Sequence, residues 1–521
     1  MRSSFTIDRR RLIALAAAPV FVRHARAADE PRFALGIASG CPLPDRMVLW
    51  TRLTGDTLPA QVDVDWELAD DETFTRIAAR GRETAEGQWA HSVHAEPAGL
   101  APGRHYFYRF TALGQRSAVG RTCTAPAPDA PATLRFAIAS CQRWDHGHYA
   151  AWRHLAADPP ELVLFLGDYI YEYASPRQAI RPHDGGLLRT HEGGVLRTLA
   201  DYRARYAQYK RDPALQAAHA ACPWLVSFDD HEVENDYAGE RGSSLQGEAL
   251  LQLRAAAYQA AWEHQPLPKA WRPQGAAMRL HGRWDWGRLA RFQVVDGRQH
   301  RDPQACLPAG RSGGSATVDA AACAALRDPQ RSLLGFAQER WLADGWDAQR
   351  PWNLLAQPTL MARCSTRPWR DVPAETPQPP GRYWNDGWDG YAAARTRLLE
   401  GIAARRLPNA VVLGGDVHAH YVADLKADFD DARAPVVASE FCGTSISSHG
   451  WQQRQVDAVL ALNPHLHHGR ADQRGYIHFT LDARRLDARL MAVERPDDPA
   501  SPVGVQARFA VEAGRPGPQR A

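Results

Sequence analysis

The stretch PWLVSFDDHEVEN (223–235) indicates the fold class, because an apolar run of strand length passes directly into a polar turn. Three other segments repeat this unit: LRFAIASCQ (134–142), ELVLFLGDYIY (161–171) and AVVLGGDVH (410–418). Short apolar runs bounded by turn residues predict buried strands. Helical patterns lie between them, at 149–158, 198–220, 245–264, 336–348 and 391–406. Alternation of strands and helices predicts a layered α/β (α+β) fold over residues 134–510, closed by a hairpin of 476–481 with 488–493.

Residues 31–126, which precede this region, have a different pattern. Strand-like runs such as VDVDWELA (62–69) and HYFYRFTAL (105–113) are separated by turn residues. Short strands at regular intervals predict an immunoglobulin-like β-sandwich. The Pro/Ala-rich segment APAPDAPAT (125–133) predicts a linker between the two domains.

The composition is that of a globular protein. Hydrophobic residues make up 45% of the 521 residues and charged residues 23%, which excludes a disordered or fibrous chain. The formal net charge is +3, and residues 1–27, with six Arg and one Asp, contribute +5 of it, which leaves −2 for the remainder. The remainder is close to neutral, so no nucleic-acid binding is expected.

Residues 1–27 have the pattern of an export signal. The basic run Arg9-Arg10-Arg11 precedes the apolar stretch LIALAAAPVFV (12–22), and Ala25-Arg26-Ala27 has the form of a cleavage site. The apolar stretch is too short to span a bilayer, and no later run is long enough, so no transmembrane segment is expected. The arginine run favours a twin-arginine signal over an ordinary secretory one. We therefore expect export by the twin-arginine machinery to the periplasm or the medium.

One disulfide is a candidate among the eight cysteines. Cys306 and Cys323 bracket a loop rich in Gly, Ser and Ala, where a bridge would restrain a flexible segment. An oxidising compartment permits this bond without requiring it.

Polar clusters follow four of the predicted strands. The first is Ser140-Cys141-Gln142, the second Gly167-Asp168-Tyr169-Ile170-Tyr171, the third 229–232 with Asn235, and the fourth Asp416-Val417-His418. Ligands in α/β sheets bind at the carboxyl ends of strands, so these side chains are expected at one sheet edge. Carboxylates gathered there would repel one another unless cations lay between them. A single cluster would be explained better by helix capping, but four in equivalent positions favour a metal site.

The order SCQ, GDYIY, DDHEVEN and GGDVH resembles the alkaline phosphatase D (PhoD) family, a branch of the calcineurin-like metallophosphoesterases. The stretches AAAYQAAWEHQPLP (255–268), WNDGWDGY (384–391) and EFCGTSISS (440–448) add to the resemblance, which covers nearly all of the chain after residue 27. It implies a metallophosphoesterase-type β-sandwich core flanked by helices. It also implies that residues 31–126 form the family's N-terminal domain.

The resemblance further implies a ligand set. Asp168 would bridge two metals, and Cys141 and Tyr171 would bind Fe(III). Ca(II) would be held by Asp230, Asn235 and Asp416, with His418 as a further ligand. Anionic sulfur and phenolate donors suit a trivalent ion, and carboxylate and amide oxygens suit calcium. Zinc or manganese in place of iron and calcium is an alternative.

Two residues are candidates for direct roles in catalysis. His231 is a general-acid candidate for the leaving group, or alternatively a hydrogen-bond partner of a metal ligand. Arg254, on the helix 245–264, is a candidate phosphate clamp, or alternatively a solvated helix residue. Trp384, Trp388 and Tyr391 are candidates for the pocket wall, or alternatively for the core.

The predicted function is that of an exported phosphoesterase. Attack of a metal-bound hydroxide on phosphorus would hydrolyse phosphate monoesters, diesters or both. Two alternatives are a phospholipase D-like diesterase and a non-catalytic cell-surface protein with a structural metal. The presence of His231 favours an enzyme over the non-catalytic protein, because a structural metal site needs no general acid.

Overall fold

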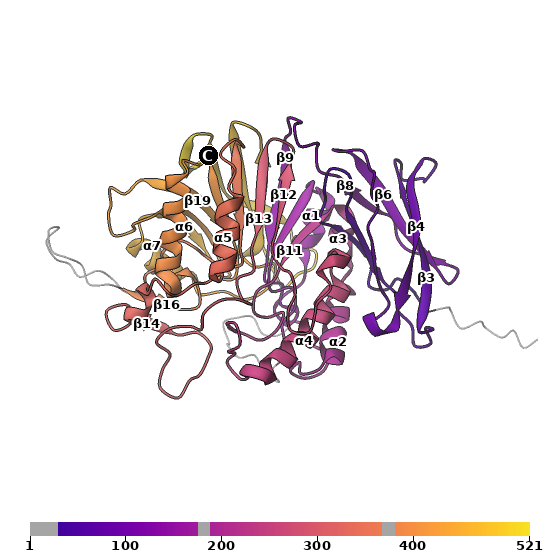
Figure 1. The fold of residues 1–521 in the computed structure, drawn as a ribbon, viewed down its shortest axis with the longest axis horizontal. Helices are drawn as coiled ribbons and strands as arrows, with labels where there is room; N and C mark the ends of the chain where they lie inside the picture. Colours follow the sequence, from indigo (N-terminus) through magenta and orange to yellow (C-terminus); the bar gives the residue numbers. More distant parts are fainter. Residues whose placement is uncertain (1–29, 176–187, 367–380) are drawn as a thin grey trace, which may run out of the picture.

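The structure is a computed structural model that describes residues 30–175, 188–366 and 381–521. Its centre consists of two β-sheets that pack face to face, with helices outside them (Figure 1). Phe136 of one sheet contacts Phe292 of the other with ring centroids 5.4 Å apart, and Phe479 and Phe441 repeat this contact at 5.4 Å. The α/β class is confirmed. The predicted signal at 1–27 lies outside the described residues.

The larger sheet has ten strands and includes three of the four polar strand ends. In spatial order the strands are β24 (Arg515–Arg520), β23 (Val503–Glu512), β22 (Arg485–Val493), β21 (Arg474–Leu481), β9 (Leu134–Ala139), β10 (Leu162–Leu166), β11 (Trp224–Ser227), β1 (Ile37–Gly40), β2 (Val48–Arg52) and β5 (Ser92–Ala95). Strands β9, β10 and β11 run parallel, so their carboxyl ends share one edge. The expected terminal hairpin is present as β21 and β22.

The second sheet has seven strands and includes the fourth polar strand end, at β17. Its strands in spatial order are β12 (Gly282–Trp286), β13 (Ala290–Val294), β15 (Trp352–Ala356), β17 (Ala410–Gly414), β19 (Val436–Cys442), β18 (His420–Lys426) and β20 (Leu466–Arg470). The expectation that all four clusters lie on one sheet edge is therefore wrong. The hydrophobic pattern marks each strand as buried but does not assign it to a sheet.

Helices cover the outer faces of both sheets. The α-helices are α1 (Ala150–Ala157), α2 (Leu199–Lys210), α3 (Pro213–Ala221), α4 (Gly247–His264), α5 (Phe336–Gly345), α6 (Ala392–Ala404) and α7 (Gln453–Leu462). Helices α1–α4 share a core with the ten-stranded sheet, and α5 and α6 share one with the seven-stranded sheet. Within the described residues, no helix combines the length and apolar character needed to cross a bilayer.

The single helix expected at 198–220 is two helices, α2 and α3. Pro213 has no N–H to continue the first helix and begins the second at its N-terminal position. Asp212 caps α3 by accepting hydrogen bonds from the N–H groups of Ala214 and Leu215.

The N-terminal part packs two layers of strands against each other. One layer is a separate sheet of β4 (Ile77–Glu86), β3 (Gln61–Ala69), β6 (His105–Ala112) and β7 (Gln115–Arg116), with β8 (Gly120–Cys123) paired to β6. The other layer is β1, β2 and β5, and Leu49 packs with Val64 and Phe110 across the interface. Because β1 pairs in parallel with β11, this second layer continues the ten-stranded sheet.

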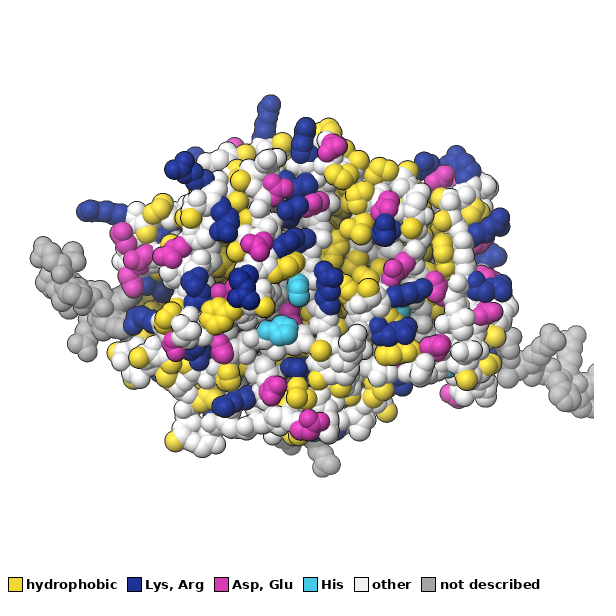
Figure 2. Space-filling model, in the orientation of Figure 1, with side chains coloured by type: hydrophobic (Ala, Val, Ile, Leu, Met, Phe, Trp, Pro, Cys, Tyr) yellow, Lys and Arg dark blue, Asp and Glu magenta, His cyan; other side chains and the backbone are white. Residues whose placement is uncertain are grey.

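The two remaining strands lie in separate connections, one between β13 and α5 and the other between β15 and α6. Strands β14 (Thr317–Asp319) and β16 (Arg382–Trp384) pair with each other. The Cys306–Cys323 disulfide is present beside them, as expected. On the face drawn in Figure 2, acidic and basic side chains are interspersed.

Candidate functional site

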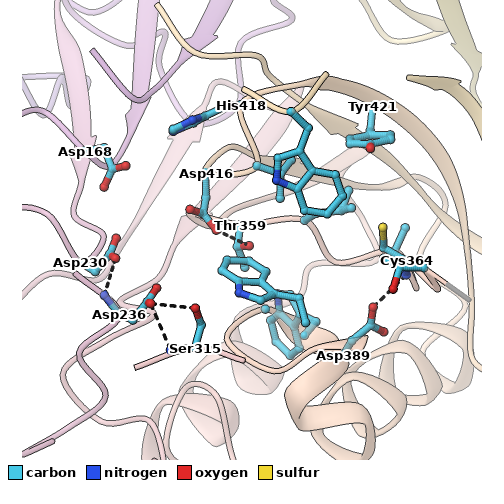
Figure 3. A pocket seen from close by; sticks show the side chains of 18 of the residues that line it. Asp168, Asp230, Asp236, Ser315, Thr359, Cys364, Asp389, Asp416, His418 and Tyr421 are labelled. Atoms are coloured by element: carbon cyan, nitrogen blue, oxygen red, sulfur yellow. Dashed lines mark hydrogen bonds between the residues drawn. The ribbon is translucent and has the colours of Figure 1, made fainter. Parts of the chain in front are cut away.

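The four polar strand ends meet between the two sheets. Ligand atoms within 4.8 Å of one another form three groups: Cys141 with Asp168 and His418; Asp168 with Asp230 and His231; and Asp168 with Asp229, Asp230 and Asp416. Asp168 belongs to all three, and Figure 3 shows it facing the same space as Asp230 and Asp416. The predicted convergence is therefore confirmed, although the side chains come from two sheets.

An unusual backbone conformation places these side chains. Cys141, Asp168, Asp416 and His418 all have positive φ, between 50° and 66°. This left-handed region is sparsely populated for residues other than glycine, and such outliers cost about 1–3 kcal/mol each and cluster at functional sites. Gly167, at φ 106°, allows close approach of the next strand end, since a Cβ there would lie 2.6 Å from Asp229 Cβ.

Tyr171 and Cys141 lie on the buried side of Asp168. The Tyr171 hydroxyl donates to Asp168 Oδ2 at 2.8 Å and accepts from Ser448 Oγ at 2.8 Å. Burial, with the charges of Asp168 and Asp416, raises the pKa of the Cys141 thiol. Burial and Asp168 likewise raise the pKa of Tyr171. Neither group would ionise readily here without a cation to stabilise the anion.

His418 has one ring nitrogen available for a metal. Its Nδ1 donates to the carbonyl of His449 at 2.5 Å, which leaves Nε2 unprotonated and 3.4 Å from the Tyr171 hydroxyl. Burial and the charge of Arg474 lower the pKa of His418 to about 3. The ring is therefore neutral at physiological pH, as metal coordination requires.

The carboxylates are more numerous than the cations around them. Burial and the neighbouring Asp229 and Asp230 raise the pKa of Asp416, and burial likewise raises that of Asp168. Asp168 Oδ1, Asp229 Oδ2 and Asp230 Oδ1 are buried without a hydrogen-bond partner. Buried carboxylate oxygens are normally paired, so this donor set fits cations bound between them.

Sequence reasoning did not identify Arg298, the cation beneath this cluster. Arg298 follows β13 and pairs with Asp229 at 2.5 Å, Asp386 at 2.8 Å and Asp230 at 3.5 Å. Burial alone would raise the pKa of Asp230, but Arg298 and His231 hold it below its usual value. The sequence signal for Arg298 is its place directly after a strand end, in DGRQH (296–300). Asp386 lies within WNDGWDGY (384–391), a stretch that contributes to the family resemblance but from which no role for Asp386 was predicted.

His231 lies at the edge of the carboxylate cluster and lines the pocket. Its Nδ1 is 2.8 Å from Glu172 Oε2, a partner that sequence reasoning also missed. Burial opposes a charge on this ring, yet Asp230, Glu172 and Asp168 raise the pKa of His231 above its usual value. These carboxylates therefore favour the protonated ring, and one ring nitrogen lies within 4.8 Å of carboxylate oxygens of Asp168 and Asp230.

Asn235 also lines the pocket. Its Oδ1 accepts a hydrogen bond from Tyr173 at 2.6 Å, and its N–H donates to Glu172 at 2.9 Å. Its role as a calcium ligand stays a prediction.

The prediction that Arg254 clamps phosphate is contradicted. Its Nε donates to the carbonyl of Ala276 at 2.8 Å, and its Nη1 donates to that of Gly239 at 2.9 Å. It does not line the pocket and is only 7% exposed. The guanidinium fixes two loops against α4, a role that depends on tertiary structure and is invisible in the helix sequence.

The pocket over the cluster has a volume of about 450 Å³. Trp384 and Trp388 line it, one of the two roles considered for them, and Trp388 also belongs to the hydrophobic core. Tyr391 does not, because it is buried and its hydroxyl donates to the carbonyl of Asp302 at 2.5 Å.

Comparisons with known proteins agree with this architecture. The sequence model of the PhoD-like phosphatases matches residues 136–490, and that of the PhoD-like phosphatase N-terminal domain matches residues 16–126. Alkaline phosphatase D of Bacillus subtilis (strain 168) is 41% identical over 499 residues, covering 93% of this chain and 82% of the relative. A solved structure described as that of PhoD superposes with a TM-score of 0.85 at 39% identity, covering 94% of this chain and 92% of the other.

Proposed function

This chain belongs to the PhoD-like phosphatase family and is a phosphoesterase, and on that premise we propose that it is an exported, metal-dependent enzyme that hydrolyses phosphate monoesters and diesters. Membership in an enzyme family argues against the alternative of a non-catalytic surface protein. The observation that carries the metal dependence is the position of Asp168 in all three groups of potential ligands.

The proposed ligands divide by their chemistry. Cys141 and Tyr171, with Asp168, would hold Fe(III), because thiolate and phenolate stabilise a trivalent ion. Asp230, Asn235 and Asp416 would hold Ca(II), which takes carboxylate and amide oxygens. His418 would complete the site through Nε2. When bound, such cations polarise phosphoryl oxygens and lower the pKa of a water molecule, making a nucleophile near neutral pH.

The chain's own residues would supply the remaining steps. His231, held by Glu172, would donate its proton to the leaving oxygen of the ester. Arg298 would hold Asp229 and Asp230 in place beneath the reacting group. The carboxylate-rich wall orients the phosphate only when cations are bound, since a phosphate dianion would otherwise be repelled.

Hydrolysis of p-nitrophenyl phosphate and its bis-ester, with and without a calcium chelator, tests the proposal. Turnover of at least one ester is expected, with loss on chelation and recovery with added calcium. Asp168→Asn should lower kcat by about 1,000-fold or more, as expected when groups that act as a unit are removed. The same substitution at the exposed Asp344 is the control. Turnover unaffected by chelators and by Asp168→Asn would contradict metal dependence.

Elemental analysis of the exported protein tests the metal assignment. Iron and calcium are expected, with a visible charge-transfer absorption from the Tyr171 phenolate. Tyr171→Phe should remove that absorption. A colourless, iron-free and active preparation, with zinc or manganese instead, would reject the assignment of Fe(III).

Export and domain structure complete the proposal. We propose that residues 1–27 direct twin-arginine export to the periplasm or the medium, and that residues 31–126 and 134–510 form an immunoglobulin-like and a catalytic domain. Replacing Arg9, Arg10 and Arg11 with Lys should retain the precursor in the cytoplasm, as measured by cell fractionation. The packing of β2 and β5 against β3 and β6 supports the N-terminal sandwich.

A further inference from the structure

The pocket continues beyond the metal-ligand cluster into a second half of different chemistry. Apolar and aromatic side chains line the pocket outside the ligand cluster, among them Leu360, Trp384, Trp388, Tyr421, Trp451 and Val456. Figure 3 shows Asp168 and Asp230 at one end of the pocket and Tyr421 and Asp389 at the other, with indole rings between them. A phosphate held at the cluster would therefore direct its organic group toward this half, which we call the aromatic half.

The part of the chain that the structure describes offers the aromatic half no basic lining side chain to receive a second anionic group. Among the described residues that line the pocket, none is Lys or Arg, and the charged groups outside the ligand cluster are Asp236 and Asp389. Asp389 accepts from Arg395 at 2.6 Å and from the Cys364 N–H at 2.8 Å. Asp236 accepts from the N–H and the hydroxyl of Ser315. Asp236 lies beside Asp230, and the charge of Asp389 is offset by Arg395. An anionic substituent would therefore lose its hydration here without gaining a cationic partner among the described lining residues.

We propose, resting on the proposed phosphoesterase function, that the aromatic half binds the organic group of the ester and selects substrates whose group is uncharged and apolar or aromatic. Burial of apolar area against Trp and Tyr rings supplies the affinity. Esters that carry further phosphate or carboxylate groups are disfavoured, because no basic side chain among the described lining residues compensates their charge.

Trp451 is the residue best placed to test this specificity. Its side chain is 45% exposed, so it lies at the pocket rim and contributes little to the core. It directly precedes α7, whose Val456 also lines the pocket. Trp388, by contrast, is 1% exposed and donates to Gln357 at 3.0 Å, so its removal would disturb the core.

Competitive inhibition by phosphonates measures the preference on the wild-type protein. Methylphosphonate, benzylphosphonate and 4-carboxybenzylphosphonate share one head group and differ only in the organic substituent. We expect the inhibition constant of benzylphosphonate to be about 10-fold lower than that of methylphosphonate, as is typical of one apolar pocket contact. The added carboxylate should cancel that gain.

Trp451→Ala assigns the preference to the aromatic half. The benzyl advantage should shrink to about 2-fold or less, with methylphosphonate inhibition unchanged. Phe336→Ala, an equally exposed aromatic residue outside the pocket lining, should change neither constant. Equal inhibition by all three phosphonates, or tighter binding of the carboxylate, would overturn this inference alone. Failure to hydrolyse any phosphate ester would overturn the proposed function and this inference with it.

Discussion

At the scale of single residues, burial and partners decide which charged groups contact substrate. Arg254 and Arg298 are both buried arginines near the pocket, yet the first binds two backbone carbonyls and the second binds three carboxylates. Asp168 differs from both, because its Oδ1 is buried without a hydrogen-bond partner. A group left unsatisfied in this way is a candidate for binding an ion, whereas a satisfied group supports the fold.

Arg254→Ala should lower stability and leave substrate affinity unchanged. Loss of the guanidinium removes the donor to the partly buried carbonyls of Ala276 and Gly239, which costs about 1–3 kcal/mol of unfolding free energy. Thermal unfolding measures that loss, and KM for p-nitrophenyl phosphate should stay at the wild-type value. A KM raised 10-fold or more, with unchanged stability, would restore the phosphate-clamp interpretation.

At the scale of elements, the site is built from turns that follow parallel strands. The clusters after β9, β10, β11 and β17 were recognisable in the sequence, because each polar turn follows an apolar run directly. Arg298 also follows the end of a strand, β13. A single arginine after a strand is not a recognisable motif, so the sequence did not single it out. Its partners Asp229 and Asp386 are distant in sequence, and only packing of the two sheets brings them together.

Arg298→Met should be among the most destabilising substitutions of a charged residue. It leaves Asp229 and Asp230 buried without their paired arginine, whereas Asp386 keeps its pair with Arg301 at 3.0 Å. Breaking a buried ion pair on one side costs about 3–5 kcal/mol. Urea denaturation with chelator present measures the effect without help from bound metal. Arg470→Met is the matched control, because its pair with Asp472 is exposed and is worth about 1 kcal/mol or less. Equal losses in the two variants would contradict the role of Arg298.

At the scale of the whole molecule, the N-terminal part is joined to the rest through a shared sheet. The sequence correctly indicated two patterns of strands, but it did not show that β1, β2 and β5 extend the ten-stranded sheet. Strand pairing between segments that are far apart in the chain leaves no local trace. Trp50 of β2 is fully buried and donates to the carbonyl of Glu263 at 3.1 Å, which ties this layer to α4.

Deleting residues 31–126 should therefore prevent the remainder from staying soluble. The deletion uncovers the edge of β11 and an apolar surface, and exposed sheet edges pair with other chains. Size-exclusion chromatography should show aggregates. A monomeric fragment with wild-type activity would show instead that the catalytic part folds alone.

Buried histidines predict that the protein loses stability in mild acid. Burial lowers the pKa of His94, His191 and His420 to about 3 and of His465 and His478 to about 4. Because the unfolded chain binds these protons near pH 6.5, stability is complete above that pH and falls as the pH drops toward the folded values. His94 alone would account for about 2 kcal/mol at about pH 5.

Thermal unfolding between about pH 7 and pH 5 checks this dependence. The melting temperature should fall, and His94→Gln should reduce the slope. The same change at the exposed His300 is the control. A melting temperature that rises on acidification would contradict the prediction.

The left-handed turns at Cys141, Asp168, Asp416 and His418 also bear on how such a centre diversifies. In a library of variants at these positions, β-branched replacements would be strongly disfavoured by the positive φ angle, whatever their ability to bind a metal. The replacements that such turns tolerate best are glycine and the short polar residues Asn, Asp and His, and most of these are themselves donors to cations. Substitutions that preserve the fold would therefore change which metal ion the site prefers more readily than they would abolish metal binding.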